Sequence, residues 1–268
     1  MRFPVVQNHL FRRQAPVFCY LEVVIAANKN DVLDAGLYVY FRHLARRAFH
    51  TIAARGLDRL RTLPDDRPVI LFCNHTNWWD GLMIYLLTRH MRHKAVYCMM
   101  EEKQLKHYRF FTWLGAFSVD LSSPLRSAAS LRYAQRLLQR NDTAIWIFPQ
   151  GKICKQSEPV EIKPGTDYLA QSAPNAMLVP VAMRYDFFRE DRPNALIEIG
   201  EPFHAVDSSE GRIAEAVNRA YVHVTQASLD QDLTGFTALF PPRLTINKRW
   251  QWVKLALTGR LREFTPTN

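Results

Sequence analysis

A histidine and an aspartate five residues apart follow a short hydrophobic run in the first third of the chain. The run is Val69–Cys73, and His75 and Asp80 come after it. A neutral imidazole can remove a proton from a hydroxyl group, and a carboxylate bonded to its other ring nitrogen fixes the tautomer. We therefore expect His75 to act as a general base that Asp80 orients. This spacing also arises by chance in a chain with nine histidines, so it needs support from other residues.

A second hydrophobic run ends in a turn whose residues suit substrate binding. The run covers 144–148, and the turn that begins at its last residue contains Phe148, Pro149, Gln150, Gly151 and Lys152. Glycine lets a backbone approach a ligand closely, while an amide and an ammonium group can contact polar or phosphate groups.

A third run, 177–182, contains Pro180, which a central strand would resist, so we expect a strand edge or a bulge there. Three hydrophobic strands that end in polar or proline-containing turns predict one crevice at their ends. His75 would lie in that crevice.

From residue 63 onward the pattern alternates between strands and helices. We predict strands near 69–73, 95–100, 116–120, 144–148, 177–183 and 195–199. We predict helices near 80–90, 102–113, 124–140, 165–173 and 208–228. Such alternation predicts an α/β fold with a mostly parallel or mixed sheet covered by helices.

Two basic, amphipathic segments flank this region. Residues 17–55 should be largely helical with a break near 28–31, with a hydrophobic stripe of Leu37, Phe41, Leu44, Ala48 and Ile52. Near the other end, a second stripe is formed by Trp250, Val253, Leu257, Leu261 and Phe264, with lysines and arginines beside it. Each segment could lie on a membrane or pack on the main domain. We therefore divide the chain into an N-terminal helical, membrane-associating segment (1–62), an α/β domain (63–240) and a C-terminal basic amphipathic helix (241–268).

Charge and cysteine content limit the kinds of partner and the cellular locations that we expect. The net charge of +10 suggests an anionic partner: nucleic acid, an anionic membrane surface or a phosphorylated substrate. The four cysteines are widely separated, so we expect no metal site and no disulfide framework. The patch Val17–Leu21 lacks the cleavage site of a signal peptide, and no hydrophobic run reaches the roughly 20 residues that span a bilayer. We expect a protein on the cytoplasmic face of a membrane.

Four blocks in a fixed order make the sequence resemble the glycerolipid acyltransferases, the group that includes the 1-acylglycerol-3-phosphate acyltransferases. Asn74–Asp80 matches the His-x4-Asp motif of that family, and Phe148–Gly151 resembles its Phe-Pro-Glu-Gly block. Gly115–Asp120 resembles the second block and Val179–Val181 the fourth, while Lys163–Gly165 resembles the Lys-Pro-Gly that follows the third. The resemblance spans about residues 69–200.

The resemblance implies acyl transfer from acyl-CoA or acyl carrier protein to a hydroxyl of a lysophospholipid or related lipid, with no cofactor, metal or covalent acyl-enzyme. His75 would take the acceptor's proton and Asp80 would orient His75. The residues expected to contact substrate are Asn74, Gly115, Arg126, Phe148, Pro149, Gln150, Gly151, Lys152 and Pro180.

Two departures from the family pattern concern the acceptor. The second block usually ends in an arginine linked to the acceptor's phosphate, whereas this chain has Leu121, with Arg126 nearby. Gln150 replaces the usual glutamate and keeps hydrogen-bonding capacity without the charge. The acceptor could thus be lysophosphatidic acid, another lysophospholipid, an ornithine-type lipid or a glycosylated lipid.

Three other functions fit part of the pattern. A lipid hydrolase would use His75 to activate water and would release free fatty acid. A weakly active lipid-binding relative would explain Leu121 and Gln150. Nucleic-acid binding would use the positive charge, but the basic residues alternate with hydrophobic stripes and no recognition motif is visible, so we expect no nucleic-acid partner.

Overall fold

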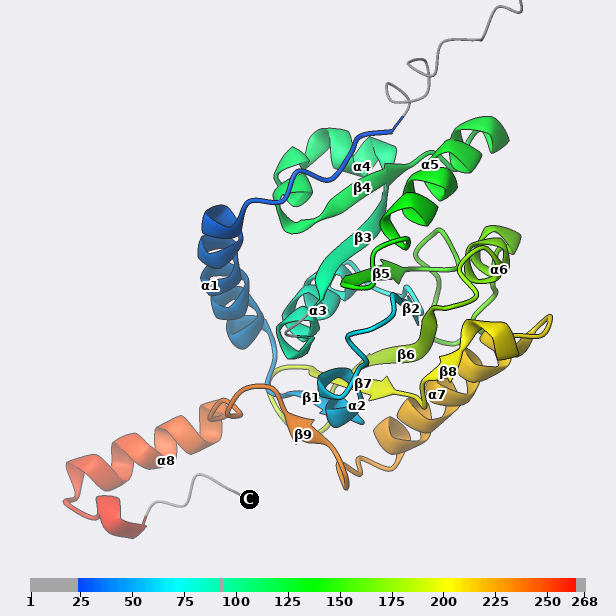
Figure 1. Cartoon of the computed structure of the whole chain (residues 1–268). Helices are drawn as coiled ribbons and strands as arrows, with labels where there is room; N and C mark the ends of the chain where they lie inside the picture. The colour runs from blue at the N-terminus through cyan, green and yellow to red at the C-terminus, as the bar shows by residue number, and fades with distance from the viewer. Residues whose placement is uncertain (1–23, 92–93, 264–268) are drawn as a thin grey trace, which may run out of the picture.

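A sheet of nine strands forms the centre of the described chain, which in this computed structural model comprises residues 24–91 and 94–263 (Figure 1). The strands are β1 (Ile52–Arg55), β2 (Val69–Cys73), β3 (Ala95–Glu101), β4 (Ala116–Val119), β5 (Thr143–Ile147), β6 (Met177–Asp186), β7 (Asn194–Ile199), β8 (Phe203–His204) and β9 (Thr237–Ala238). Their order is β4-β3-β5-β2-β6-β7-β1-β9, and β8 pairs with β6 beside this path.

Helices connect these strands. The α-helices are α1 (Asp31–Ala48), α2 (Leu57–Arg61), α3 (Asp80–Leu87), α4 (Glu102–His107), α5 (Pro124–Leu137), α6 (Pro164–Gln171), α7 (Arg212–Leu229) and α8 (Ile246–Leu257). The 3-10 helices are η2 (Thr88–His90), η3 (Arg109–Leu114), η4 (Ala205–Asp207) and η5 (Leu261–Glu263). Strand and helix positions predicted from residue 63 onward are confirmed within a few residues.

Most strand pairs are parallel. Strands β4, β3, β5, β2 and β6 all run in one direction, and β7 reverses it by pairing antiparallel with β6. β1 is parallel to β7, and β9 is antiparallel to β1. The predicted α/β fold with a mixed, mostly parallel sheet is confirmed.

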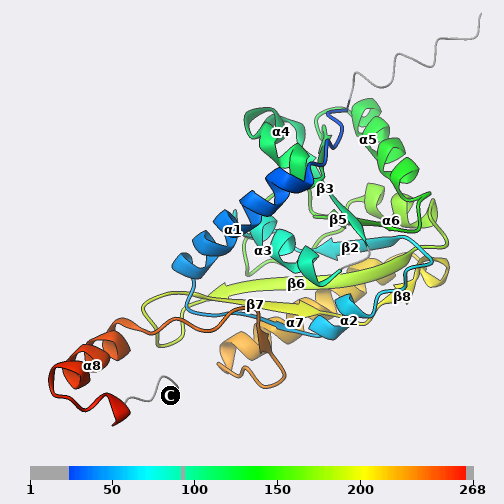
Figure 2. The ribbon, with the colours of Figure 1, turned by 60° about the vertical axis from the view of Figure 1, so that its left-hand side comes forward.

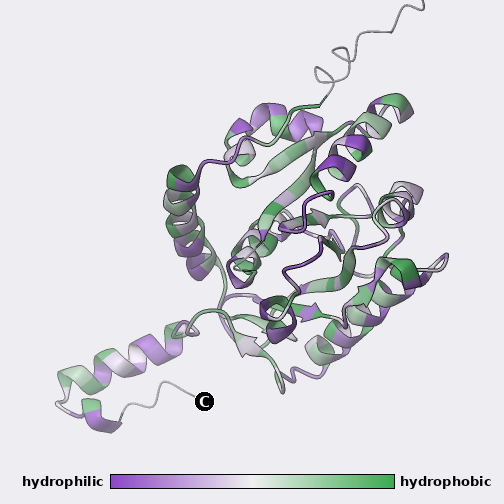
Figure 3. Ribbon diagram, viewed as in Figure 1, coloured by the Kyte–Doolittle hydropathy of each residue, from purple (hydrophilic) through white to green (hydrophobic). Residues whose placement is uncertain are grey.

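Helices cover both faces of the sheet (Figure 2). The hydrophobic residues of β2 alternate between the two sides: Leu71 packs in one cluster with α1 and α3, and Phe72 in another with α5, α6 and α7. Figure 3 shows the hydrophobic residues concentrated along the strands and on helix faces turned toward them. Because both faces are buried, β2 and β5 are continuous hydrophobic runs, as parallel strands require.

The helix expected to continue to residue 55 ends at Ala48 instead. Residues 52–55 form β1, which pairs with β7 on one side and β9 on the other. Ile52 and Ala54 pack on one face of the sheet and Ala53 on the other. Pairing and burial on both faces override the helical spacing that had placed Ile52 in the stripe of α1.

Pro180 lies in a central strand, so of the two predictions for it, a strand edge or a bulge, the strand edge is wrong. The neighbouring chain changes at this point: β7 pairs with β6 from Val181 onward, and β8 pairs with Leu178 and Met177. The carbonyl of Pro180 accepts from Gly200 N, and its ring nitrogen therefore faces the gap between β7 and β8. A residue without an N–H group is tolerated there because no strand requires that donor.

The C-terminal helix α8 projects from the rest of the molecule (Figures 1 and 2). None of its twelve residues is buried. Of the stripe predicted for it, Phe264 lies outside the described residues, as does the patch Val17–Leu21 near the start. Among the described residues, no helix is long and hydrophobic enough to cross a bilayer.

Candidate active site

The turn after β2 is held in place by Asn74, which is completely buried. Its side-chain amide donates to Met183 O of β6 at 2.9 Å, and its side-chain oxygen accepts from Met183 N at 2.6 Å. This pair of bonds replaces the strand ladder at the point where β2 ends. The chain therefore leaves the sheet in a defined direction, toward His75.

His75 and Asp80 are in direct contact, as their spacing predicts. The distance from His75 Nδ1 to Asp80 Oδ2 is 2.8 Å, and Asp80 is the first residue of α3. With Nδ1 bonded to the carboxylate, Nε2 is the ring nitrogen that can take a proton from a substrate. The side chain of His75 is partly exposed and that of Asp80 is fully buried.

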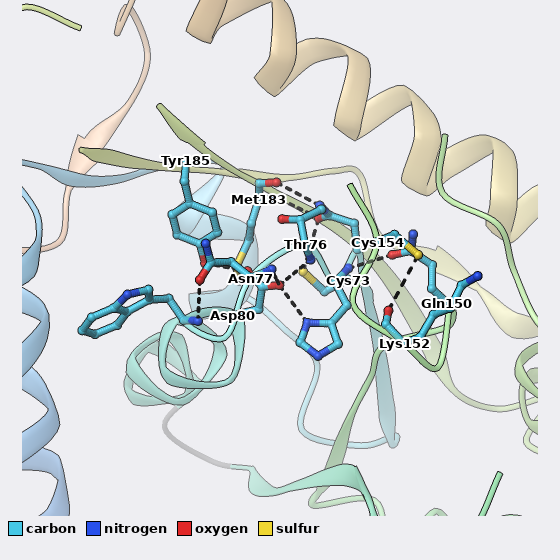
Figure 4. Close-up of polar contacts among 12 residues, drawn as sticks. Cys73, Thr76, Asn77, Asp80, Gln150, Lys152, Cys154, Met183 and Tyr185 are labelled. Atoms are coloured by element: carbon cyan, nitrogen blue, oxygen red, sulfur yellow. Dashed lines mark hydrogen bonds and ion pairs between the residues drawn. The ribbon is translucent and has the colours of Figure 1, made fainter. Parts of the chain in front are cut away.

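Three further groups donate to the Asp80 carboxylate (Figure 4). Thr76 N and Asn77 N donate to Oδ2 at 2.7 and 2.8 Å, and the Tyr185 hydroxyl donates to Oδ1 at 2.6 Å. Burial, and then the neighbouring charge of Asp80, raise the pKa of Tyr185 well above its usual value, so this hydroxyl keeps its proton. The carboxylate is consequently fixed in position, with hydrogen-bond donors around its negative charge.

The backbone and ring of His75 are also fixed. His75 N donates to Gln150 Oε1 at 2.7 Å, and His75 O accepts from Cys154 N at 2.8 Å. The imidazole stacks on the ring of Phe148, with centroids 4.3 Å apart. The loop after β5 thereby holds the backbone and the ring face of the histidine, while Asp80 holds Nδ1.

Gly151 is required by the same loop. Its φ is +65°, and a Cβ atom there would lie 2.7 Å from Lys163 Nζ. Lys163 N in turn donates to Pro149 O at 3.1 Å. A side chain at position 151 would therefore strain the turn and displace a lysine at the cavity.

A hydrophobic cavity of about 930 Å³ opens beside His75. One wall comes from α1, α3 and η3, and it includes Phe41, Leu82, Tyr85, Phe110 and Phe111. Another lies along β3 and β5, which pair only as far as Cys98 and Trp146. Two lysines, Lys152 and Lys163, also line the cavity. Burial raises the pKa of the Cys98 thiol, another lining group, to about 12, which keeps it neutral.

The expected substrate residues fall into two sets. His75, Phe148, Pro149, Gly151 and Lys152 line the cavity. The residues that the cavity wall does not include are Asn74, Asp80, Gly115, Gln150, Arg126 and Pro180. Asn74, Asp80 and Gln150 act on the position of His75 through the bonds described above.

Gly115 and Arg126 are engaged elsewhere. Gly115 has a φ of +99°, and a Cβ there would lie 2.4 Å from Val96 O, so the sheet itself requires glycine. Arg126 forms ion pairs with Glu102 at 2.5 Å and Asp120 at 2.8 Å. Lys106 also pairs with Glu102 and, with the Arg126 bond, lowers the pKa of that carboxyl.

Sequence patterns gave no sign of Tyr185, which belongs to no recognised block. It lies on β6, four residues after the block at Val179–Val181, and its signal is only that of an alternating strand position. Of the two tryptophans in the turn between His75 and Asp80, Trp79 packs edge-on against Phe49, while Trp78 is exposed and lines the cavity.

Comparison with known proteins supports the residue pattern. A family model described as Acyltransferase matches residues 24–184, which is more than half of the chain. The chain belongs to the acyltransferase family. The solved structure of the 1-acyl-sn-glycerophosphate (LPA) acyltransferase PlsC from Thermotoga maritima is similar at 15% sequence identity, covers 79% of each chain and gives a TM-score of 0.48. No curated protein matches.

Membership of the acyltransferase family implies an acyl donor and a lipid acceptor. The matched region contains both the His75 turn and the loop at Phe148–Lys152 that holds it.

Proposed function

We propose that this acyltransferase moves a fatty acyl group from a thioester, on CoA or acyl carrier protein, to a hydroxyl of a lysophospholipid or related lipid. The observation that carries the proposal is the contact of His75 with the buried Asp80 at the wall of a hydrophobic cavity of about 930 Å³. A base beside a hydrophobic cavity suits a reaction between a hydroxyl group and a long-chain thioester.

His75 Nε2 takes the proton of the acceptor hydroxyl as its oxygen attacks the thioester carbonyl. The C–O bond forms, the tetrahedral intermediate collapses and the C–S bond breaks. The imidazolium then returns the proton to the departing thiolate, so the thiol is the second product. Asp80 stabilises the imidazolium and keeps Nε2 turned to the substrate.

The other walls suit the remaining parts of both substrates. The aromatic and aliphatic side chains of α1, α3 and η3 would take an acyl chain, and Lys152 and Lys163 would meet phosphate groups of donor or acceptor. A contact between Arg126 and an acceptor phosphate stays a prediction, and it would have to compete with two carboxylates.

Both reactants suggest where the reaction takes place. A lysolipid resides in a membrane, and CoA and carrier-protein thioesters are made in the cytoplasm. We therefore propose that the protein is a peripheral membrane protein at the cytoplasmic face of a membrane.

Product analysis tests the proposal. The purified chain is given a labelled long-chain acyl-CoA or acyl carrier protein together with lysophosphatidic acid, another lysophospholipid, a lyso-ornithine lipid or a glycolipid bearing a free hydroxyl. Formation of the diacylated product from one acceptor is expected. Free fatty acid as the only labelled product would contradict acyl transfer and indicate a hydrolase. No consumption of any thioester would indicate a binding protein.

A further inference from the structure

Helix α8 has a hydrophobic stripe that faces solvent. Ile246, Trp250, Val253 and Leu257 recur at spacings of three and four residues, which places them on one side of a helix. Ile246 is 62% exposed, Trp250 61% and Leu257 83%, while Val253 is half-buried. Because none of these residues is buried, this part of the stripe does not close the core of the α/β domain, which was the alternative that the sequence left open.

Two cations lie beside this stripe. At about 100° per residue, Arg249 and Lys254 flank its centre by about 70° on opposite sides. Helix α8 contains no acidic residue. Figure 3 shows hydrophobic and hydrophilic segments alternating along its exposed length. Hydrophobic groups flanked by basic side chains, with a tryptophan among them, suit the boundary between lipid tails and anionic headgroups.

The segment before α8 is attached to the edge of the sheet that carries the active site. Arg243 N donates to His50 O at 3.1 Å, and the Arg243 guanidinium donates to Arg46 O at 3.2 Å. Residue 50 lies two positions before β1, whose first residue, Ile52, pairs with Ala195 at the start of β7.

This connection fixes on which side of the molecule α8 begins. Ala195 also pairs with Tyr185 near the end of β6. β6 is parallel to β2, so the end of β6 and the end of β2 lie at the same edge of the sheet. The turn containing His75 follows β2, and Phe49, one residue before His50, contacts Trp79 of that turn. Helix α8 thus leaves from the catalytic edge.

The rim of the cavity, like the stripe of α8, has hydrophobic side chains that are exposed to solvent. Tyr40, Trp78, Tyr108, Leu121 and Ile153 line the cavity and are also exposed to solvent. Exposed hydrophobic residues around an opening suit contact with an apolar phase. A molecule that rests on lipid through α8 would bring this catalytic edge near the same surface.

We propose that α8 is an interfacial helix that docks on an anionic lipid surface through Ile246, Trp250, Val253 and Leu257, with Arg249 and Lys254 at the headgroups. The helix lies in the plane of the surface and tethers the catalytic edge of the sheet to it. The proposal deepens the proposed function, on which it rests for its biological purpose, but the binding itself can be measured without any enzymatic activity.

Vesicle sedimentation of the full chain tests the docking. The parent is mixed with vesicles of phosphatidylcholine alone or of phosphatidylcholine and phosphatidylglycerol in equal parts. We compare Trp250→Ser/Leu257→Ser, which interrupts the stripe, and Arg249→Gln/Lys254→Gln, which removes the flanking charges. Trp252→Ser is the matched control because Trp252 is an exposed tryptophan of the same helix outside the stripe. Circular dichroism verifies that each variant keeps the fold.

The parent should bind the anionic vesicles more tightly than the neutral ones, and high salt should weaken that binding. The stripe variant should lose about tenfold or more in affinity, the charge variant a smaller factor, and Trp252→Ser little. Equal binding by parent and stripe variant would overturn the proposal. So would a self-association of the parent that the stripe variant loses, because the stripe would then bind a second copy of the chain.

Activity measurements separate this inference from the proposed function. If the chain binds vesicles through the stripe but transfers no acyl group, the docking stands and the reaction fails. If the chain is active, the stripe variant should lose turnover of a vesicle-embedded acceptor but keep turnover of a short-chain acceptor dissolved in water. An equal loss on both acceptors would contradict docking as the function of α8.

Discussion

The turn from Asn74 to Asp80 and the cluster around Arg126 use their polar groups in opposite ways. Around Asp80 every donor converges on one carboxylate, which in turn fixes one histidine at the cavity. Around Arg126 two carboxylates surround one guanidinium, and the arginine is not part of the cavity wall. The first arrangement leaves one histidine fixed at the cavity, and in the second the opposite charges neutralise one another.

This difference suggests that the residues around Asp80 serve the reaction, whereas the Arg126 cluster does little to bind the acceptor. In the Arg126 cluster, the charges of Arg126 and Lys106 balance those of Glu102 and Asp120. Little net charge remains there for a phosphate group. We therefore expect recognition of an anionic acceptor to depend more on Lys152 and Lys163, which line the cavity.

Changing the carboxylate of Asp80 should have a large effect on the rate. We expect Asp80→Asn to lower kcat by roughly 10²- to 10⁴-fold, because the amide carries no charge and cannot accept from every donor around it. Turnover is measured under saturating donor and acceptor, with thermal unfolding as the check on folding. Turnover within a factor of about two of the parent would show that His75 needs no orienting carboxylate.

The bond from His75 N to Gln150 should matter less. We expect Gln150→Ala to lower kcat by about tenfold, because losing a buried hydrogen bond costs about 1–3 kcal/mol and frees the histidine backbone. Gln150→Glu is the matched control, since its carboxylate can still accept from His75 N. If both variants lose the same activity, the side chain has a role other than holding that backbone group.

Removing the hydroxyl of Tyr185 should have a smaller effect on rate. We expect Tyr185→Phe to lower kcat by about three- to tenfold, because Asp80 keeps its other donors but Oδ1 loses one.

The same variant should also change how the free energy of unfolding depends on pH. The pKa of Tyr185 is raised in the fold, so its contribution is present below about pH 10 and is lost as the unfolded tyrosine ionises above it. The alkaline loss of stability should be shallower in Tyr185→Phe, and identical slopes would count against the raised pKa.

The smallest effect is expected in the arginine cluster. Arg126→Ala should change the KM for a phosphorylated acceptor by less than about threefold, because Arg126 is paired with two carboxylates and is not part of the cavity wall. Lys152→Ala should raise that KM more, and neither variant should change kcat greatly. A large rise in KM for Arg126→Ala alone would restore the arginine as the phosphate ligand and remove the contrast between the two clusters.

Much of the fold could be predicted because the central strands are hydrophobic on both faces. Val69–Cys73 and Thr143–Ile147 are buried throughout, and such short runs between turns are typical of parallel strands. β1 was missed because its first residue, Ile52, continues the helical spacing of α1. Only pairing with β7 and β9, distant in sequence, makes residues 52–55 a strand.

The parts of the candidate active site that lie within one short segment of the chain could be predicted. His75 and Asp80 lie in one turn, so their contact follows from spacing. Tyr185 reaches Asp80 across 105 residues, and its participation depends on the pairing of β6 with β2. The hydrophobic stripe of α8 was visible because its spacing depends only on its own residues. Its exposure required knowing that nothing in the described domain covers it.

The most direct test of the account is the acyl-transfer rate of His75→Ala, measured with the donor and acceptor that the parent uses best. The variant removes the imidazole and leaves Asp80 with its backbone donors and Tyr185. We predict a folded protein that forms the diacylated product about 10²- to 10⁴-fold more slowly than the parent. A folded His75→Ala variant that forms this product at the parent's rate would contradict the central claim.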